Sequence, residues 1–338
     1  MVDKRATLGE KLLLWAGYAG FFVFCFLLFA YWTFPYDRVK TVLIDQAQAS
    51  SPGSKVEIAS LDPHWLGVQL EQVRVETPPQ KPGGKPNVIE LDELTVSSSP
   101  IALAFGGTSV DFSATLGEGE LEGTYSEEEE GPTSLALELD AVDVGNLGLA
   151  PYTKIPLEGA MTGELDVTLA KEPAQTEGHV ELEIADCSAG DGKAKIPVPG
   201  FGGLTVPKVN LGTLGLKVAI KEGVATVEKL EAKGKDATLS GSGSVRLVQP
   251  FKRSRADLAL GIKVDDGLTK REPKIKAMLG MAKGFMAPDG SIRLNLTGAI
   301  SNLKAKAGAG AGKRGPRAGT PPKARRPGKG RAKKRAPR

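Results

Sequence analysis

The feature that most constrains this chain is a two-residue alternation of apolar and polar side chains from about residue 55 to residue 303. A β-strand directs successive side chains to opposite faces, so each such run places its apolar residues on one face. We count about a dozen runs of this kind. Their aliphatic positions include Leu135, Leu137, Leu139, Leu165, Val167, Leu169, Val180, Leu182, Ile184, Leu258, Leu260, Ile262, Leu294 and Leu296.

Turn signals separate the runs at short intervals. Glu222-Gly223 and Asp289-Gly290 are two examples. Short connections join antiparallel neighbours, so we expect a mostly antiparallel meander. Two stretches, Val142–Leu149 and Glu272–Lys283, are predicted to be short helices.

A sheet that is apolar on one face needs something to cover that face. The two predicted helices are too short, so the sheet is expected to fold over on itself as a sandwich, a closed barrel or an open half-barrel. The fold class is therefore all-β, a long, twisted, curved sheet. In an open sheet the aliphatic positions would line an apolar, concave groove that attracts lipid or a protein partner. In a closed sheet the same residues would be core.

An N-terminal segment of 25 residues, Leu12 to Tyr36, contains no charge. About 20 apolar residues suffice to cross roughly 30 Å of hydrocarbon. Aromatic residues lie near both ends of the segment, as is typical of membrane interfaces. A cleaved signal peptide is disfavoured by the bulky residues at the end of the segment, and a soluble helix by the absence of a polar face. The predicted membrane-anchor residues are Trp15, Tyr18, Tyr31, Trp32 and Tyr36.

The domain organisation follows from these boundaries. Residues 1–11 form a predicted cytoplasmic stub carrying Lys4, Arg5 and Lys11, and residues 12–36 a single transmembrane helix. Residues 37–54 form a juxtamembrane helix and linker, with amphipathic helix predicted over Tyr36–Gln48. Residues 55–303 are the β domain, expected in the periplasm behind a bacterial inner membrane.

The tail after residue 304 differs in composition from the rest. Residues 313–338 hold 12 Lys or Arg and no acid, whereas residues 1–312 carry a formal net charge of −8. A segment of Ala, Gly, Pro, Arg and Lys cannot bury a core and is expected to be disordered. Outside the cytoplasm it would meet anionic lipid or other anionic envelope polymers. Nucleic acid is disfavoured, because the tail also lacks aromatic residues for base stacking. The alternative is an extension without a specific role.

The sequence contains no recognisable catalytic pattern. Its two histidines, His64 and His179, are about 115 residues apart, and no His/Cys cluster has metal-ligand spacing. Cys25 in the apolar segment and Cys187 in a predicted strand are not expected to form a disulfide. The Glu127–Glu130 run is most typical of a solvated hairpin loop. We therefore expect no catalysis, no cofactor and no metal site.

Several segments together resemble a known family. The anchor ends in Phe34-Pro35-Tyr36, and Trp65-Leu66-Gly67-Val68-Gln69-Leu70 follows. Later come Ile155-Pro156-Leu157-x-Gly159-x-x-x-Gly163 and Asp289-Gly290-x-Ile292-x-Leu294-x-Leu296-x-Gly298. In their order and spacing these resemble the type II secretion system protein N family, in the form found in delta-proteobacteria and Leptospira. The resemblance covers about residues 12–303 and excludes the basic tail.

This resemblance implies a non-catalytic inner-membrane component of a secretion machine that spans the periplasm, with other secretion-system components as partners. The same strand pattern is similar to that of AsmA/TamB-like proteins, whose curved sheets carry lipid in an apolar groove. The second hypothesis is therefore a lipid-binding or lipid-transfer protein with phospholipid as its ligand.

Overall fold

The structure is a computed structural model, and it describes residues 8–33, 36–50, 53–64, 66–79, 86–99, 107–128, 131–148, 155–193, 195–198, 202–205, 207–281 and 286–308. The motif residues Phe34, Pro35 and Trp65 lie outside this part, as do residues 309–338 of the predicted disordered tail. The first residues of that tail, 304–307, are instead part of a strand, because they pair with the strand before them, so this part of the prediction is wrong.

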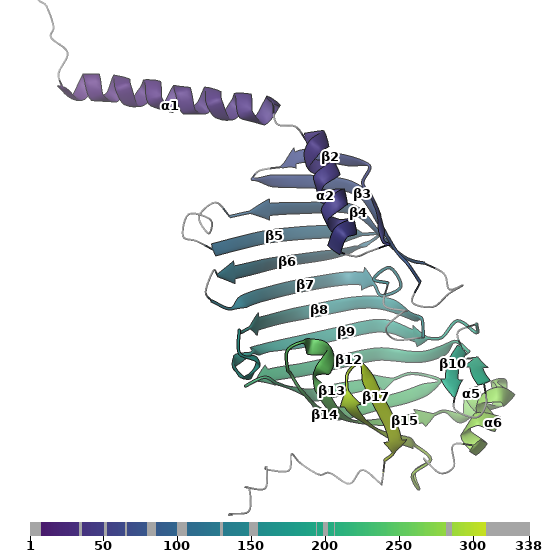
Figure 1. The fold of residues 1–338 in the computed structure, drawn as a ribbon. Helices are drawn as coiled ribbons and strands as arrows, with labels where there is room; N and C mark the ends of the chain where they lie inside the picture. Colours follow the sequence, from purple (N-terminus) through teal and green to yellow (C-terminus); the bar gives the residue numbers. More distant parts are fainter. Residues whose placement is uncertain are drawn as a thin grey trace, which may run out of the picture.

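Two helices precede the sheet (Figure 1). Helix α1 covers Leu8–Thr33, and α2 covers Tyr36–Ser50, as the amphipathic pattern predicted. Leu43 and Ile44 of α2 pack against buried Ile58, Leu70 and Val73. Lys40 Nζ also donates a 2.8 Å hydrogen bond to the carbonyl of Ala59, so α2 is attached to the first strands by both apolar and polar contacts.

One antiparallel sheet of 15 strands forms the body. Its order is β1-β3-β4-β5-β6-β7-β8-β9-β12-β13-β14-β15-β16-β17, with β2 also paired to β3. The bounds are β1 Lys55–Glu57, β2 Ser60–His64, β3 Gly67–Thr77, β4 Asn87–Ser98, β5 Gly107–Leu116, β6 Gly119–Glu128, β7 Thr133–Asp143, β8 Leu157–Leu169, β9 Glu177–Ala189, β12 Val209–Lys221, β13 Val224–Lys233, β14 Ala237–Arg246, β15 Arg255–Val264, β16 Ile292–Ala299 and β17 Asn302–Ala307.

Smaller elements interrupt this meander. A separate hairpin of β10 (Lys195–Val198) and β11 (Gly202–Thr205) lies between β9 and β12 in sequence. Short 3-10 turns cover Pro173–Gln175 and Phe251–Arg253. Helices α5 (Asp266–Arg271) and α6 (Pro273–Met281) stand between β15 and β16.

The sheet is open. Strands that neighbour each other in sequence also neighbour each other in the sheet, apart from the crossing around β2 and the β10–β11 hairpin. In the described residues no pairing joins β17 to the β1–β3 end. The strands therefore follow one another in a single row from the end beside α2 to the C-terminal strands (Figure 1). The closed barrel among the sequence-based alternatives is therefore wrong, and the mostly antiparallel all-β fold is confirmed.

Bulges bend the long strands. Ala141 and Asp186 have φ of +49° and lie where the β7–β8 and β8–β9 registers shift. A bulge adds a residue to one strand and increases its local twist. Beside these bulges Val142, Val144, Met161, Ile184 and Cys187 form the fully packed part of the core, with Val142 at 0% exposure.

One predicted helix is wrong and the other is confirmed. Residues 142–148 continue β7 to Asp143 and then form a turn, in which the Asp143 carboxylate accepts a 2.9 Å hydrogen bond from the Gly145 N–H. The apolar residues of this segment are spaced for burial beside a bulge, and that spacing is similar to the spacing of apolar residues on one face of a helix. Glu272–Lys283 does contain α6, whereas α5 was missed because six residues are too few to show a period.

Candidate functional site: the two faces of the sheet

The strand register places the predicted aliphatic positions on one face, which we call the apolar face. Leu137 of β7 lies opposite Leu165 of β8, which lies opposite Val180 of β9 and then Val218 of β12. This row continues through Val227, Gly243, Leu258 and Leu296 to β16. A parallel row joins Leu139, Gly163, Leu182, Leu216, Leu230, Gly241, Leu260 and Leu294.

Two glycines do not interrupt the apolar face: Gly123 of β6, which lies opposite Leu137, and Gly241 of β14. A Cβ on Gly123 would come within 2.5 Å of the Phe112 ring and 2.6 Å of Leu137 Cδ2. A Cβ on Gly241 would meet Leu230 Cδ2 at 2.5 Å and Leu260 Cδ2 at 2.9 Å. Neighbouring apolar side chains therefore occupy the space above Gly123 and Gly241, and the face stays apolar at these two positions.

The apolar face is only partly covered. Of the 14 residues predicted to line a groove, Leu139 and Ile184 are buried and the other 12 are half-buried. Helix α2 packs over the β1–β4 end. The strand registers place these residues on one face of the sheet, whereas a walled, concave groove stays a prediction.

The predicted anchor residues lie on or next to α1. Trp15 is 76% exposed and Tyr18 is 68% exposed. Most of the other aromatic side chains that the structure describes in this helix are exposed as well. Tyr31 and Trp32 are in the helix, but their side chains lie outside the described part; Tyr36 begins α2 and is half-buried. Within the described residues no helix has both the length and the apolar character needed to cross a membrane.

The opposite face of the sheet is polar and strongly charged. Four glutamates face one another across four consecutive strands, Glu122 opposite Glu138, Glu138 opposite Glu164, and Glu164 opposite Glu181. We call this row the glutamate ladder. A favourable cross-strand pair stabilises a sheet by about 0.2–1 kcal/mol, whereas two like charges directly opposite each other destabilise it. A hollow of about 580 Å³ lies over β4–β9 here and is lined by Asp111, Glu122, Glu138, Glu164, Asp166 and His179, among others.

Among the described residues, cationic side chains contact the glutamate ladder only near its β9 end. Lys217 Nζ donates a 2.6 Å hydrogen bond to Glu181 Oε2, and this contact lowers the pKa of the Glu181 carboxyl and raises that of Lys217. Glu164 lies 3.3 Å from His179 Nε2. In the described part of the chain, Glu122 and Glu138 have no cationic partner. Half of the ladder is therefore uncompensated.

Charge is divided between the two halves of the sheet. Residues 107–189, which contain β5–β9, hold 19 acidic residues and two lysines, a formal net charge of −17. Residues 209–307, which contain β12–β17, hold 18 basic and nine acidic residues, a net charge of +9. The ion pairs Lys208–Glu158 and Lys217–Glu181 lie where the two halves meet.

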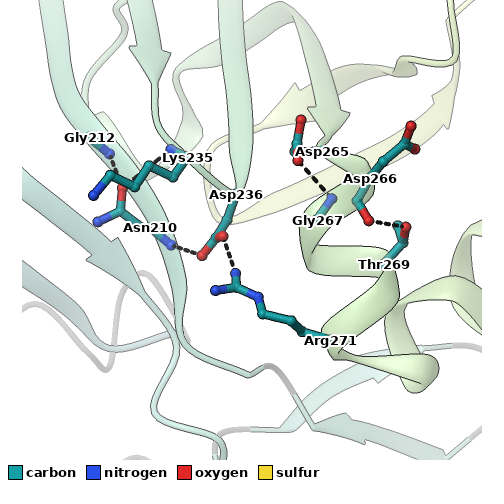
Figure 2. Close-up of polar contacts among 9 residues, drawn as sticks. All are labelled: Asn210, Gly212, Lys235, Asp236, Asp265, Asp266, Gly267, Thr269 and Arg271. Carbon is teal, nitrogen blue, oxygen red and sulfur yellow. Dashed lines mark hydrogen bonds and ion pairs between the residues drawn. The ribbon is translucent and has the colours of Figure 1, made fainter.

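A buried carboxylate joins the C-terminal helices to the sheet (Figure 2). Asp236, in the β13–β14 turn, accepts a 2.9 Å hydrogen bond from the Asn210 N–H of β12 and another from the Arg271 guanidinium of α5. Its carbonyl accepts from the Asp265 N–H at 2.9 Å, and the Asp265 carboxylate caps α5 through the Gly267 N–H at 2.7 Å. These hydrogen bonds hold α5 against the sheet, so we assign the cluster a structural role.

Reactive groups are scattered in the described part of the chain. His64 in β2 and His179 in β9 are on strands far apart in the sheet order, and no group of His, Cys, Asp and Glu there is arranged to hold a metal. Both cysteines are free, and burial raises the pKa of the Cys187 thiol. The sheet presents two extended faces, one apolar and one polar. The expectation of a non-catalytic protein without cofactor stays a prediction.

Comparisons with protein-family models, with curated proteins and with solved structures each found no match. The family resemblance therefore depends on the sequence motifs quoted above.

Proposed function

We propose that this chain is a non-catalytic, inner-membrane-anchored component of a type II protein secretion system, with its sheet in the periplasm. The observation that carries the proposal is the open sheet itself, whose apolar face is left half-covered behind one N-terminal apolar helix. A surface of this kind is suited to packing against other components of an assembly. The family resemblance supplies the identity of that assembly.

Two glycines of the family motifs occupy positions where the backbone conformation favours glycine. Gly163 has φ of +155°, and a Cβ there would lie 2.1 Å from the Glu181 carbonyl of β9. Gly298 also has positive φ, +127°. These glycines permit close strand pairing on β8 and β16, which supports a shared sheet architecture.

The anchor rests on α1. Its exposed aromatic residues, such as Trp15, Phe22 and Phe24, would be costly to leave in water. The bilayer is the environment in which we propose they lie, with the basic residues 4, 5 and 11 on the cytoplasmic side. Phosphatase and fluorescent-protein fusions after residue 303 test this topology: periplasmic phosphatase activity is expected, and cytoplasmic fluorescence would contradict both anchor orientation and function.

The secretion role is tested by purification and by deletion. The full chain, extracted in mild detergent, is expected to copurify with secretion-system components, and its loss is expected to leave exoproteins in the periplasm. Normal exoprotein release in the deletion strain would overturn the proposal.

A second candidate function is lipid binding in the manner of AsmA/TamB-like proteins. The specific observation that favours it is the continuity of the aliphatic rows from β7 to β16, which could accommodate extended acyl chains. Mass spectrometry of the purified chain would then detect phospholipid at near-stoichiometric amounts. The variants Val167→Asp and Ile262→Asp should lose that lipid while remaining folded, and a lipid-free wild type would exclude this candidate.

A further inference from the structure

We propose that the glutamate ladder of β6–β9 is the docking surface for the chain's own basic segment, residues 313–338. Charge complementarity is the first argument. The strands that carry the ladder belong to a region of net charge −17, and the segment carries 12 positive charges without one acid. The proposal does not depend on the secretion role, because it concerns the polar face.

The ladder has a deficit that this segment can fill. Glu122 and Glu138 are exposed and have no cationic partner in the described part, and the hollow above them is open to an incoming chain. Successive lysines or arginines of an extended segment would lie across the strands, each placed between opposing carboxylates. Binding would thereby remove the repulsion between directly opposed glutamates.

The geometry permits the contact within one molecule. The described chain ends at residue 308, just after β17, and 30 residues follow. From β17 to β6 there are nine strand-to-strand steps, about 43 Å along the sheet at roughly 4.8 Å each. Thirty residues can extend to about 100 Å, and a flexible chain of that length has a typical end-to-end distance of about 30 Å.

The sheet also directs the segment toward the ladder. Strands β12–β17, from which it emerges, belong to a region of net charge +9 that repels it, whereas β5–β9 attract it. Lys304 and Lys306 of β17 lie opposite Thr297 and Asn295, on the polar face of the sheet. Tethering gives the segment an effective concentration in the millimolar range at the ladder.

The test uses the full chain in detergent at low salt and measures the initial rate of trypsin cleavage within residues 313–338. The variant Glu122→Gln with Glu138→Gln is expected to raise that rate at least about threefold. The control, Glu228→Gln with Glu231→Gln, removes the same charge from the basic half and should leave the rate unchanged.

Salt at 0.5 M should abolish the difference in cleavage rate between wild type and the Glu122→Gln, Glu138→Gln variant, because the contact is between exposed charges. Circular dichroism verifies that each variant is folded. Equal cleavage rates in wild type and both variants would overturn the proposal.

A second measurement identifies the occupant. Carbodiimide coupling of a 1:1 mixture of ¹⁴N- and ¹⁵N-labelled chains should join tail lysines to Glu122 or Glu138 within one isotope only. Cross-links between isotopes would instead assign the ladder to the tail of a second copy. Protection from trypsin that appears only after phosphatidylglycerol is added to the micelles would assign the tail to an anionic membrane. Either result overturns intramolecular docking.

Discussion

Val142 in β7 and Val167 in β8 are valines on neighbouring strands, but they have different surroundings. Val142 is fully buried beside the β7 bulge, whereas Val167 is half-buried on the apolar face. Val142→Asp should therefore cost several kcal/mol, because the carboxylate has no water and no partner. Val167→Asp should cost much less, about 1–2 kcal/mol, because its carboxylate can reach solvent. Urea unfolding of the two variants checks this difference. Equal destabilisation would mean that the apolar face is covered.

At the scale of the element, α5 depends on one carboxylate. Asp236 is 10% exposed in its side chain and joins Asn210 to Arg271, so Asp236→Ala should cost about 1–3 kcal/mol by leaving the Asn210 N–H unsatisfied. Arg271→Ala should cost less than about 1 kcal/mol, since that side chain is 63% exposed. Thermal unfolding measures both. A larger effect at Arg271 than at Asp236 would show that the ion pair, rather than the backbone hydrogen bond, holds α5 in place.

At the scale of the whole molecule, an open sheet that has no second sheet packed on it in the described part of the chain should loosen from its ends. Strand β17 has a neighbour on one side, whereas β8, β9 and β12 have neighbours on both. Hydrogen–deuterium exchange of the full chain in detergent is expected to be at least about tenfold slower in β8, β9 and β12 than in β17. Uniform protection across all strands would indicate that a further layer, such as a second copy, covers the sheet edges.

The alternation of side chains by itself determined that each strand has one apolar face, because side-chain direction in a strand depends only on position along it. The short turns between the runs determined that neighbouring strands are antiparallel. Leu165 and Val180 could be assigned to that face without knowing what lies beside them. The amphipathic period of residues 36–48 likewise predicted α2.

Only the tertiary structure decided how far the sheet closes and which side chains oppose one another. The bulges at Ala141 and Asp186 shift the register, so β7 continues where the spacing indicated a helix. The glutamate ladder exists because four strands pair in one register, and Glu122 and Glu181 are 59 positions apart in sequence. Alternation specifies a face within each strand, but the pairing between strands depends on bulges, turns and edges that act over long distances in the chain.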